Sequence, residues 1–352
     1  MKIVSYISGH GFGHLAQMAP VLNHIHYIRP DCQFFIRCAL PKQEIQSRLT
    51  FSFELESTPV DVGVVQKNAV EEDRQSSIEQ MQSWIEQMDW QVEQEIELLR
   101  PFNPSLIISN ISPLAFPVAK ALAVAGIGLA TLDWHTIYSH WLDRDNAMLK
   151  KLAEAYKQCD LLLTPPMAMD MKVFPEQHEI ALISSQAVEI TNPIAMDDSR
   201  KKALIVFGGC GNPPYDLHAL SHMPEWLFLI PDAPDNAPDN VQSVHFDADH
   251  RPIDMMAIVD VVLCKPGYGV LSECWSTATP IAWVERPDFP EFPMLKAWLD
   301  GSFPSSGMTR SEFQQSNWQH ALDNAQSHPG KFPELLGNGA YEAADIILSY
   351  AP

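Results

Sequence analysis

Short runs of hydrophobic residues alternate with longer amphipathic segments along the first half of the chain. Residues 2–8, 33–39, 106–109, 128–132 and 161–164 are apolar enough to form buried strands. Several of the segments between them have the length of a helix. Continuous apolar strands that alternate with helices are typical of a parallel sheet covered by helices on both faces. The pattern therefore predicts an α/β fold.

The same organisation begins again after residue 200. An apolar run at 202–207 leads into a glycine-rich segment, and further strand-like runs follow at 226–230, 241–245, 259–264 and 280–284. A chain of 352 residues suits two domains. We therefore expect two Rossmann-like domains that face a cleft. They cover residues 1–190 and 191–352, with a linker near 186–200 and a last helix that can pack back on the first domain.

Residues 71–100 follow a different pattern, because apolar side chains recur on one face at helical spacing. This face consists of Ile78, Met81, Ile85, Met88, Val92, Ile96 and Leu99. One long amphipathic helix packed on its own domain is the simplest interpretation. A dimer interface and a mobile cover over a substrate site are the alternatives, so a homodimer is one expectation.

Composition narrows the range of partners. The chain has 23 Lys and Arg against 44 Asp and Glu, a net charge of −21, which disfavours nucleic acids and anionic membranes. Six cysteines are scattered without a C-x-x-C pair, as in free thiols of a reducing compartment. The longest apolar stretch, 114–132, contains proline, lysine and glycine and predicts a helix and a strand. With a strand pattern at its start in place of a signal peptide, the chain is expected to be cytoplasmic, without stable membrane insertion.

The strongest candidate site is the segment 264–273, Cys-Lys-Pro-Gly-Tyr-Gly-Val-Leu-Ser-Glu, between a buried strand and a helix that should begin near residue 270. Ligands of α/β sheets bind at the carboxyl ends of strands, and a helix N-terminus attracts a diphosphate. Gly267 and Gly269 let an anion approach the main chain, and Lys265 adds positive charge. Glu273 can accept two hydrogen bonds from a ribose diol. The alternative is a connection between strand and helix in which the glycines only allow the backbone to turn.

A second candidate is the loop 8–14, Ser-Gly-His-Gly-Phe-Gly-His, between the first strand and the first helix. Gly11 and Gly13 are expected to line a substrate site. His14 at the helix start would have its charged form disfavoured by the helix dipole, which suits a neutral base. His10 is the second candidate for this role, and either histidine could instead only pack or cap.

Two further segments give weaker signals. Gly209 and Gly211 could place backbone donors near the same diphosphate, or simply form a turn. Asp133 and His135 follow a strand and could line the cleft. The histidines and carboxylates show no metal-ligand spacing, so neither a metal nor another cofactor is expected.

Together, the two-domain pattern, the loop 8–14 and the segment 265–273 resemble nucleotide-sugar glycosyltransferases of the GT-B fold. With the run 279–293, Thr-Pro-Ile-Ala-Trp-Val-Glu-Arg-Pro-Asp-Phe-Pro-Glu-Phe-Pro, they look most like the glycosyltransferase-like region that precedes the kinase of L-arabinokinases. Plant secondary-metabolite glycosyltransferases and the bacterial lipid-linked N-acetylglucosaminyltransferase are similar at a greater distance. The resemblance is specific over about residues 3–20 and 259–295.

The resemblance implies a metal-independent transfer from a nucleotide-diphosphate sugar, such as a UDP-sugar, to a soluble small-molecule or glycan acceptor. The first domain would bind the acceptor and the second the donor, and His14 would deprotonate the acceptor. Glu273 would bind the donor ribose, Glu291 the donor sugar and Phe246 the base. The diphosphate would contact Lys265, Gly267, Tyr268, Gly269 and Val270.

The chain departs from the resembled plant enzymes at the partner of the catalytic histidine. Those enzymes carry an aspartate where this chain has Asn110. An asparagine orients an imidazole but does not stabilise its protonated form as a carboxylate does. Three alternatives stay open: Asp133 replaces the aspartate, His10 is the base, or the protein binds a nucleotide sugar without transferring it. A hydrolase or epimerase of the same fold is a further alternative.

Overall fold

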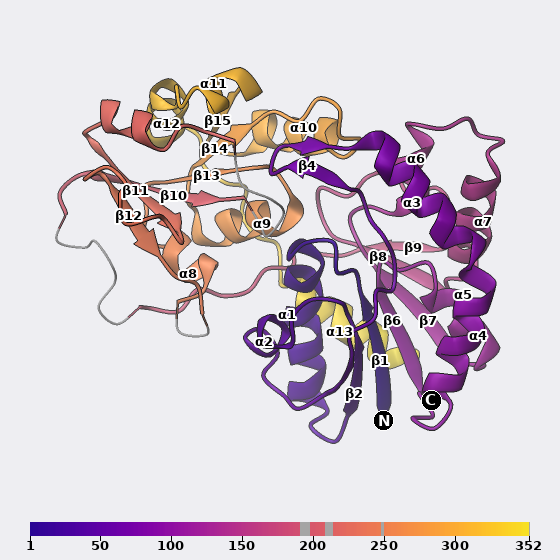
Figure 1. The fold of residues 1–352 in the computed structure, drawn as a ribbon. Coiled ribbons are helices and arrows are strands. Elements are labelled where there is room, and N and C mark those ends of the chain that lie inside the picture. Colours follow the sequence, from indigo (N-terminus) through magenta and orange to yellow (C-terminus); the bar gives the residue numbers. More distant parts are fainter. Residues whose placement is uncertain (191–197, 208–213, 248–249, 352) are drawn as a thin grey trace. The chain divides into compact units, whose positions relative to one another are not determined.

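The computed structural model describes residues 1–190, 198–207, 214–247 and 250–351, and forms two compact units (Figure 1). Unit 1 comprises Met1–Val65, Asp73–Ser184 and Leu335–Pro352, and unit 2 comprises Gln66–Glu72 and Ser185–Glu334. The predicted contacts of Gly209 and Gly211, and part of the predicted linker, lie outside the described residues. No helix in the described ranges is both long and apolar enough to cross a membrane.

Unit 1 is built on a parallel seven-stranded sheet in the order β3-β2-β1-β6-β7-β8-β9. Its strands are β1 (Lys2–Ile7), β2 (Gln33–Arg37), β3 (Glu54–Glu56), β6 (Leu106–Asn110), β7 (Ala125–Leu129), β8 (Leu161–Thr164) and β9 (Gln177–Glu179). Its helices are α1 (Gly13–Ile28), α2 (Lys42–Gln46), α3 (Arg74–Glu86), α4 (Met88–Leu99), α5 (Ala115–Ala121), α6 (Trp134–Ser139), α7 (Ala147–Tyr156) and α13 (Gly339–Ser349). The predicted α/β class is confirmed.

Unit 2 is built on a second parallel sheet, of six strands, in the order β12-β11-β10-β13-β14-β15. Its strands are β10 (Lys201–Val206), β11 (Trp226–Pro231), β12 (Val241–Val244), β13 (Val261–Cys264), β14 (Ile281–Val284) and β15 (Ser305–Met308). Its helices are η1 (His218–His222, a 3-10 helix), α8 (Pro252–Met256), α9 (Tyr268–Thr277), α10 (Phe292–Ser302), α11 (Arg310–Gln314) and α12 (Gln319–Gln326).

The single helix predicted over residues 71–100 is wrong in two respects. The structure has two helices, α3 and α4, which meet at Gln87. The first begins at Arg74, because the side chain of Asp73 accepts a hydrogen bond from Ser76 N and caps it. The predicted apolar face is nevertheless largely buried within unit 1, with Met81, Ile85 and others in the core.

A short antiparallel hairpin, β4 (Gln66–Asn68) and β5 (Glu71–Glu72), comes from the first half of the chain but belongs to unit 2. Its tip residues Ala69 and Val70 are fully buried in the hydrophobic core of unit 2. Glu72 forms a buried ion pair with Arg286, at 3.4 Å between Oε2 and Nη2. No hydrophobic pattern of the sequence indicated that this hairpin belongs to unit 2.

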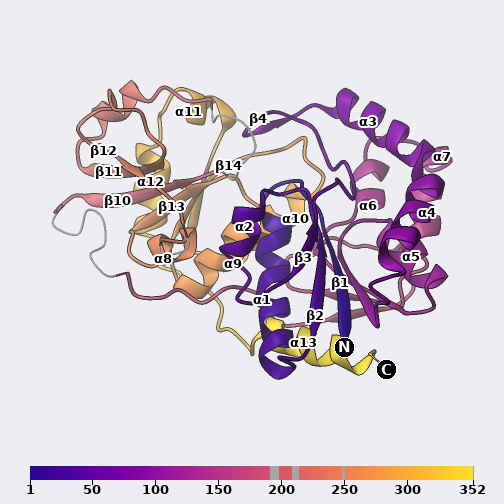
Figure 2. The same cartoon turned by 60° about the horizontal axis from the view of Figure 1, so that its bottom comes forward.

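The last helix, α13, packs on α1 of unit 1 (Figure 2). The rings of His24 and Tyr341 stack with centroids 3.8 Å apart. Glu342 accepts a hydrogen bond from Ala181 N at 2.9 Å. A Cβ on Gly339 would lie 1.9 Å from the carbonyl oxygen of Ala181, so only glycine fits at the start of this helix. The C-terminus therefore completes the unit in which the chain begins.

Candidate functional site

The loop between β1 and α1 lies at the carboxyl edge of the first sheet, beside the end of β6. Ser8 N donates to the carbonyl oxygen of Asn110 at 2.8 Å. Gly11 adopts a φ of 91°, which L-residues rarely adopt, and Gly13 begins α1. The turn brings His14 Nδ1 to 2.6 Å from Asn110 Oδ1. Two residues that the sequence singled out are thus direct partners.

A chain of amide groups determines which nitrogen of His14 carries the proton. Asn110 Nδ2 donates to Gln17 Oε1 at 3.0 Å, and Gln17 Nε2 donates to Thr131 Oγ1 at 3.2 Å. Since the amide nitrogen of Asn110 is used as a donor, its oxygen accepts, and His14 Nδ1 carries the hydrogen. Nε2 then keeps its lone pair. Burial lowers the pKa of His14, so the neutral base predominates near neutral pH.

Asp61 is a buried carboxylate of this site that the sequence analysis missed. Its Oδ1 accepts from Ser8 Oγ at 2.8 Å, and its Oδ2 accepts from Trp134 Nε1 at 3.0 Å. Its charge opposes the lowering of the His14 pKa by burial, and burial in turn raises the pKa of Asp61. Its one signal in the sequence is a lone charge in the otherwise apolar run 59–65, which carries no known motif.

His10 lies in the same loop as His14. Its Nε2 accepts a hydrogen bond from Val64 N at 3.3 Å, and its ring meets Trp134 edge to face with centroids 6.0 Å apart. A Cβ on Gly63 would lie 2.3 Å from the His10 ring, and Gly63 has a φ of +55°. The backbone therefore engages the Nε2 lone pair of His10.

Asp133 is the N-cap of α6. Its Oδ1 accepts from Thr136 N at 2.8 Å and its Oδ2 accepts from Thr136 Oγ1 at 2.5 Å. Burial raises the pKa of Asp133 to about 6. His135 is half-buried, and burial lowers its pKa. Both carboxylate oxygens of Asp133 thus serve the helix terminus, as an N-cap requires.

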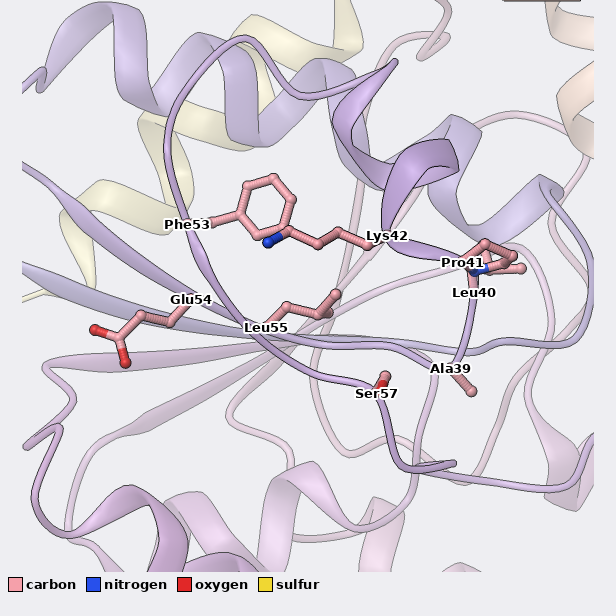
Figure 3. Close-up of a pocket in the computed structure, with 8 residues that line it drawn as sticks. All are labelled: Ala39, Leu40, Pro41, Lys42, Phe53, Glu54, Leu55 and Ser57. Carbon is pink, nitrogen blue, oxygen red and sulfur yellow. The ribbon is translucent and has the colours of Figure 1, made fainter.

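A cavity of about 740 Å³ adjoins the loop in unit 1 (Figure 3). It is lined by Ala39, Leu40, Pro41, Lys42, Phe53, Glu54, Leu55 and Ser57. A Cβ on Gly9 would lie 3.0 Å from Ala39 Cβ, so the cavity wall touches the histidine loop directly. The lining mixes apolar surface with the Lys42 amino group, the Glu54 carboxylate and the Ser57 hydroxyl.

In unit 2, the predicted diphosphate loop follows β13 as a strand-turn-helix connection. α9 begins at Tyr268, two residues before the predicted start. Leu271 N donates to the carbonyl oxygen of Gly267 and closes the first turn of the helix. A Cβ on Gly267 would meet no atom of the described residues within 4 Å, which leaves open space at the helix start. Glu273, 6% exposed, lies one turn further.

The remaining predicted contacts of this unit lie along the same sheet edge. Gly269 and Val270 belong to the first turn of α9. Lys265 follows the end of β13, and Phe246 is half-buried just after β12, which is separated from β13 by the two strands β11 and β10. Glu291 is buried at the N-cap position of α10.

Glu291 shares its electrostatic surroundings with two cations. Burial raises its pKa to about 7, while Arg286 and Lys265 act in the opposite direction. Arg286 is itself buried, lies 4.0 Å from the ring centroid of Phe289 and pairs with Glu72. Lys265 is thus close enough to Glu291 for its charge to act on the pKa of that carboxyl, and the buried ion pair of Arg286 with Glu72 is a feature that the sequence did not indicate.

The raised pKa of Glu291 makes the stability of unit 2 depend on pH. Between its ordinary pKa of 4.5 and about 7, the folded state holds a proton that the unfolded state releases. The stability that Glu291 contributes is therefore present at low pH and lost as the pH rises through this window. We expect the free energy of unfolding of Glu291→Gln, relative to that of the parent, to rise by up to about 3 kcal/mol between roughly pH 5 and pH 8.

Urea unfolding at several pH values measures this difference. The exposed Glu225→Gln variant in the same unit is the control, and its stability should follow that of the parent at every pH. A Glu291→Gln difference that stays constant with pH would contradict the assignment.

Among the described residues, no group of three or more His, Cys, Asp or Glu side chains could hold a metal ion. The diphosphate contacts predicted for unit 2 are a helix N-terminus and a lysine, and the base predicted for unit 1 is an imidazole whose Nδ1 lies beside an amide oxygen.

Comparisons with known proteins define the fold class. A kitacinnamycin glycosyltransferase aligns over 100% of this chain and 99% of that chain, with a TM-score of 0.66 and 14% identity. UGT89C1 of Arabidopsis thaliana aligns over 99% of both chains, with a TM-score of 0.64 and 13% identity. The calicheamicin glycosyltransferase CalG4 aligns over 99% and 98%, with a TM-score of 0.64 and 12% identity. The chain has the GT-B glycosyltransferase fold.

A particular relative is found by sequence. The chain is 25% identical over 362 residues to L-arabinokinase of Arabidopsis thaliana, which covers 97% of this chain and 34% of that protein. The chain thus spans about a third of that relative's length. No protein-family model matches the sequence. The resemblance to the region of L-arabinokinases seen in the sequence is confirmed at this level.

Proposed function

We propose that this protein transfers a sugar from a nucleotide-diphosphate sugar to a hydroxyl group of a soluble acceptor. The observation that carries the proposal is the network in which Asn110 and Gln17 hold His14 with a lone pair on Nε2. The GT-B fold and the similarity to L-arabinokinase support it. Similar solved structures with 11% to 12% identity are complexes with UDP and with UDP-L-rhamnose, which supports a UDP-sugar donor.

The proposed reaction is a single displacement at the anomeric carbon. The acceptor hydroxyl gives its proton to His14 Nε2 while its oxygen forms the new bond to the sugar. The bond from the sugar to the diphosphate breaks, and the nucleoside diphosphate leaves with the electron pair. One displacement inverts the anomeric configuration. The first turn of α9 and Lys265 would stabilise the charge that develops on the leaving group, so the reaction needs no metal.

The other donor contacts follow the resemblance. Glu273 would accept hydrogen bonds from the ribose, Glu291 would contact the sugar hydroxyls, and Phe246 would stack on the base. We assign the cavity beside Gly9 to the acceptor, because it adjoins the histidine loop. The net charge of −21 and the buried free thiols support a cytoplasmic protein. A homodimer stays a prediction.

Donor binding tests the assignment of Glu273. We expect Glu273→Gln to bind UDP or the matching nucleotide roughly 10–100-fold more weakly, because one charged acceptor of two hydrogen bonds is lost. Isothermal titration calorimetry measures the dissociation constant. Glu225→Gln, an exposed change in the same unit, should bind like the parent. An unchanged affinity of Glu273→Gln would remove this residue from the ribose site.

A thermal-shift screen with nucleoside diphosphates and their sugars identifies the donor, since a ligand of the folded state raises the unfolding midpoint. Turnover of the best donor is then followed with and without an acceptor panel. Product formed only with an acceptor supports transfer. Turnover without one supports a hydrolase or epimerase, and binding without turnover supports a nucleotide-sugar-binding protein.

A further inference from the structure

Asp61 is a carboxylate in the interior of unit 1 that, among the described residues, accepts hydrogen bonds from uncharged donors. It is 6% exposed, and the two groups that donate to it are the Ser8 hydroxyl and the Trp134 indole. An ionised carboxylate in such surroundings is unfavourable unless a positive charge lies nearby. The position therefore needs either a proton or a cation.

Among the groups that feel the charge of Asp61 are His14, Cys38, Tyr138 and Tyr156. Burial raises the pKa of the Cys38 thiol to about 11 and raises the pKa of both tyrosines. All three are consequently neutral near neutral pH. His14 is the member of these four that can become positive.

Two contacts hold Asp61 and His14 in one assembly. Trp134 donates its indole N–H to Asp61, and its ring meets the His14 ring with centroids 5.9 Å apart. Ser8, the other donor to Asp61, lies on the same loop as His14 and bonds to the carbonyl oxygen of Asn110. The loop that presents the base is therefore the loop that anchors the carboxylate.

We propose that Asp61 is the acidic positioning partner of His14, in place of the aspartate that Asn110 replaces. The inference rests on the proposed function. The two tasks of the aspartate in the resembled enzymes, to orient the histidine and to stabilise its charged form, would be divided between two side chains. Asn110 orients the ring through Nδ1–H, and Asp61 supplies the negative charge. When the acceptor's proton reaches Nε2, the imidazolium is stabilised by the Asp61 carboxylate. The proton stays on His14 and none is passed to Asp61.

Titration of His14 by NMR tests the pairing without turnover. In Asp61→Asn we expect the pKa of His14 to fall by roughly one pH unit, because a stabilising negative charge is removed. Asp133→Asn is the matched control: it makes the same change at a buried aspartate of this unit, asparagine is an equally good N-cap, and His14 should titrate as in the parent. An unchanged titration of His14 in Asp61→Asn overturns the inference.

A measurement on the parent protein covers the case in which Asp61→Asn does not fold. Coupled groups report on each other, so the carboxyl carbon resonance of Asp61 should show an inflection at the pKa of His14. A carboxyl resonance that is flat through that pH range overturns the inference as well.

Kinetics distinguish this role from a structural one. We expect Asp61→Asn to lower kcat by roughly 10–100-fold, with the acidic limb of the pH–rate profile displaced to lower pH and the KM for the donor unchanged. A loss of kcat without displacement of that limb overturns the inference. If no transfer is found but His14 titrates as expected, the pairing stands and the proposed function fails.

Discussion

Replacing His14 by alanine should lower kcat by roughly 100–10,000-fold, the range that a general base contributes. The donor dissociation constant should stay within a factor of about two, because the predicted donor contacts belong to unit 2. The reason lies in the amide network, which holds Nδ1 as a donor and leaves Nε2 as the proton acceptor. Release of nucleoside diphosphate in the presence of an acceptor measures the rate, and calorimetry measures donor affinity.

His140→Ala is the control for this experiment, because His140 is an exposed histidine of the same unit. It should transfer sugar at the parental rate. His10→Ala gives the competing outcome: if it loses activity while His14→Ala keeps it, His10 is the base. Equal rates for the parent and His14→Ala would exclude His14 from the chemistry.

Replacing Glu72 by alanine should destabilise unit 2 by about 3–5 kcal/mol, the usual cost of removing one partner of a buried ion pair. Arg286 would be left buried and charged, and its Nε already has no hydrogen-bond partner among the described residues. Urea unfolding followed by tryptophan fluorescence measures the effect. The double variant Glu72→Leu/Arg286→Met should recover most of the loss, because it removes both charges.

Glu71→Ala is the matched control on the same hairpin. Glu71 is half-buried, and its contact with Gln314 is a weak hydrogen bond of 3.5 Å. We expect Glu71→Ala to lower the free energy of unfolding by less than about 1 kcal/mol. Equal losses for Glu71→Ala and Glu72→Ala would show that the ion pair with Arg286 contributes little.

The central strands of both sheets were predictable because parallel strands buried on both faces are continuous apolar runs. The predicted run 128–132 is the exception in position, since β7 covers Ala125–Leu129. The edge strands β3, β9 and β15 were not predicted. They have three or four residues and several polar or exposed positions, so they leave no hydrophobic signature. These segments become strands because they pair with the neighbouring strand of the sheet.

The sequence by itself determined the features that depend on neighbours along the chain. These are the α/β class, the His14 loop at the start of α1 and the Lys265–Glu273 segment at the start of α9, since strand ends and helix starts are local. It also identified Asn110 as the departure from the resembled enzymes.

Only the tertiary structure decided which partners the buried carboxylates have. Asp61 and Ser8 are 53 positions apart, and Glu72 and Arg286 are 214 positions apart. A lone carboxylate in an apolar run looks the same in sequence whether it faces solvent or a buried imidazole. Its role depends on desolvation and on the partner that folding brings beside it, and neither is encoded by local spacing.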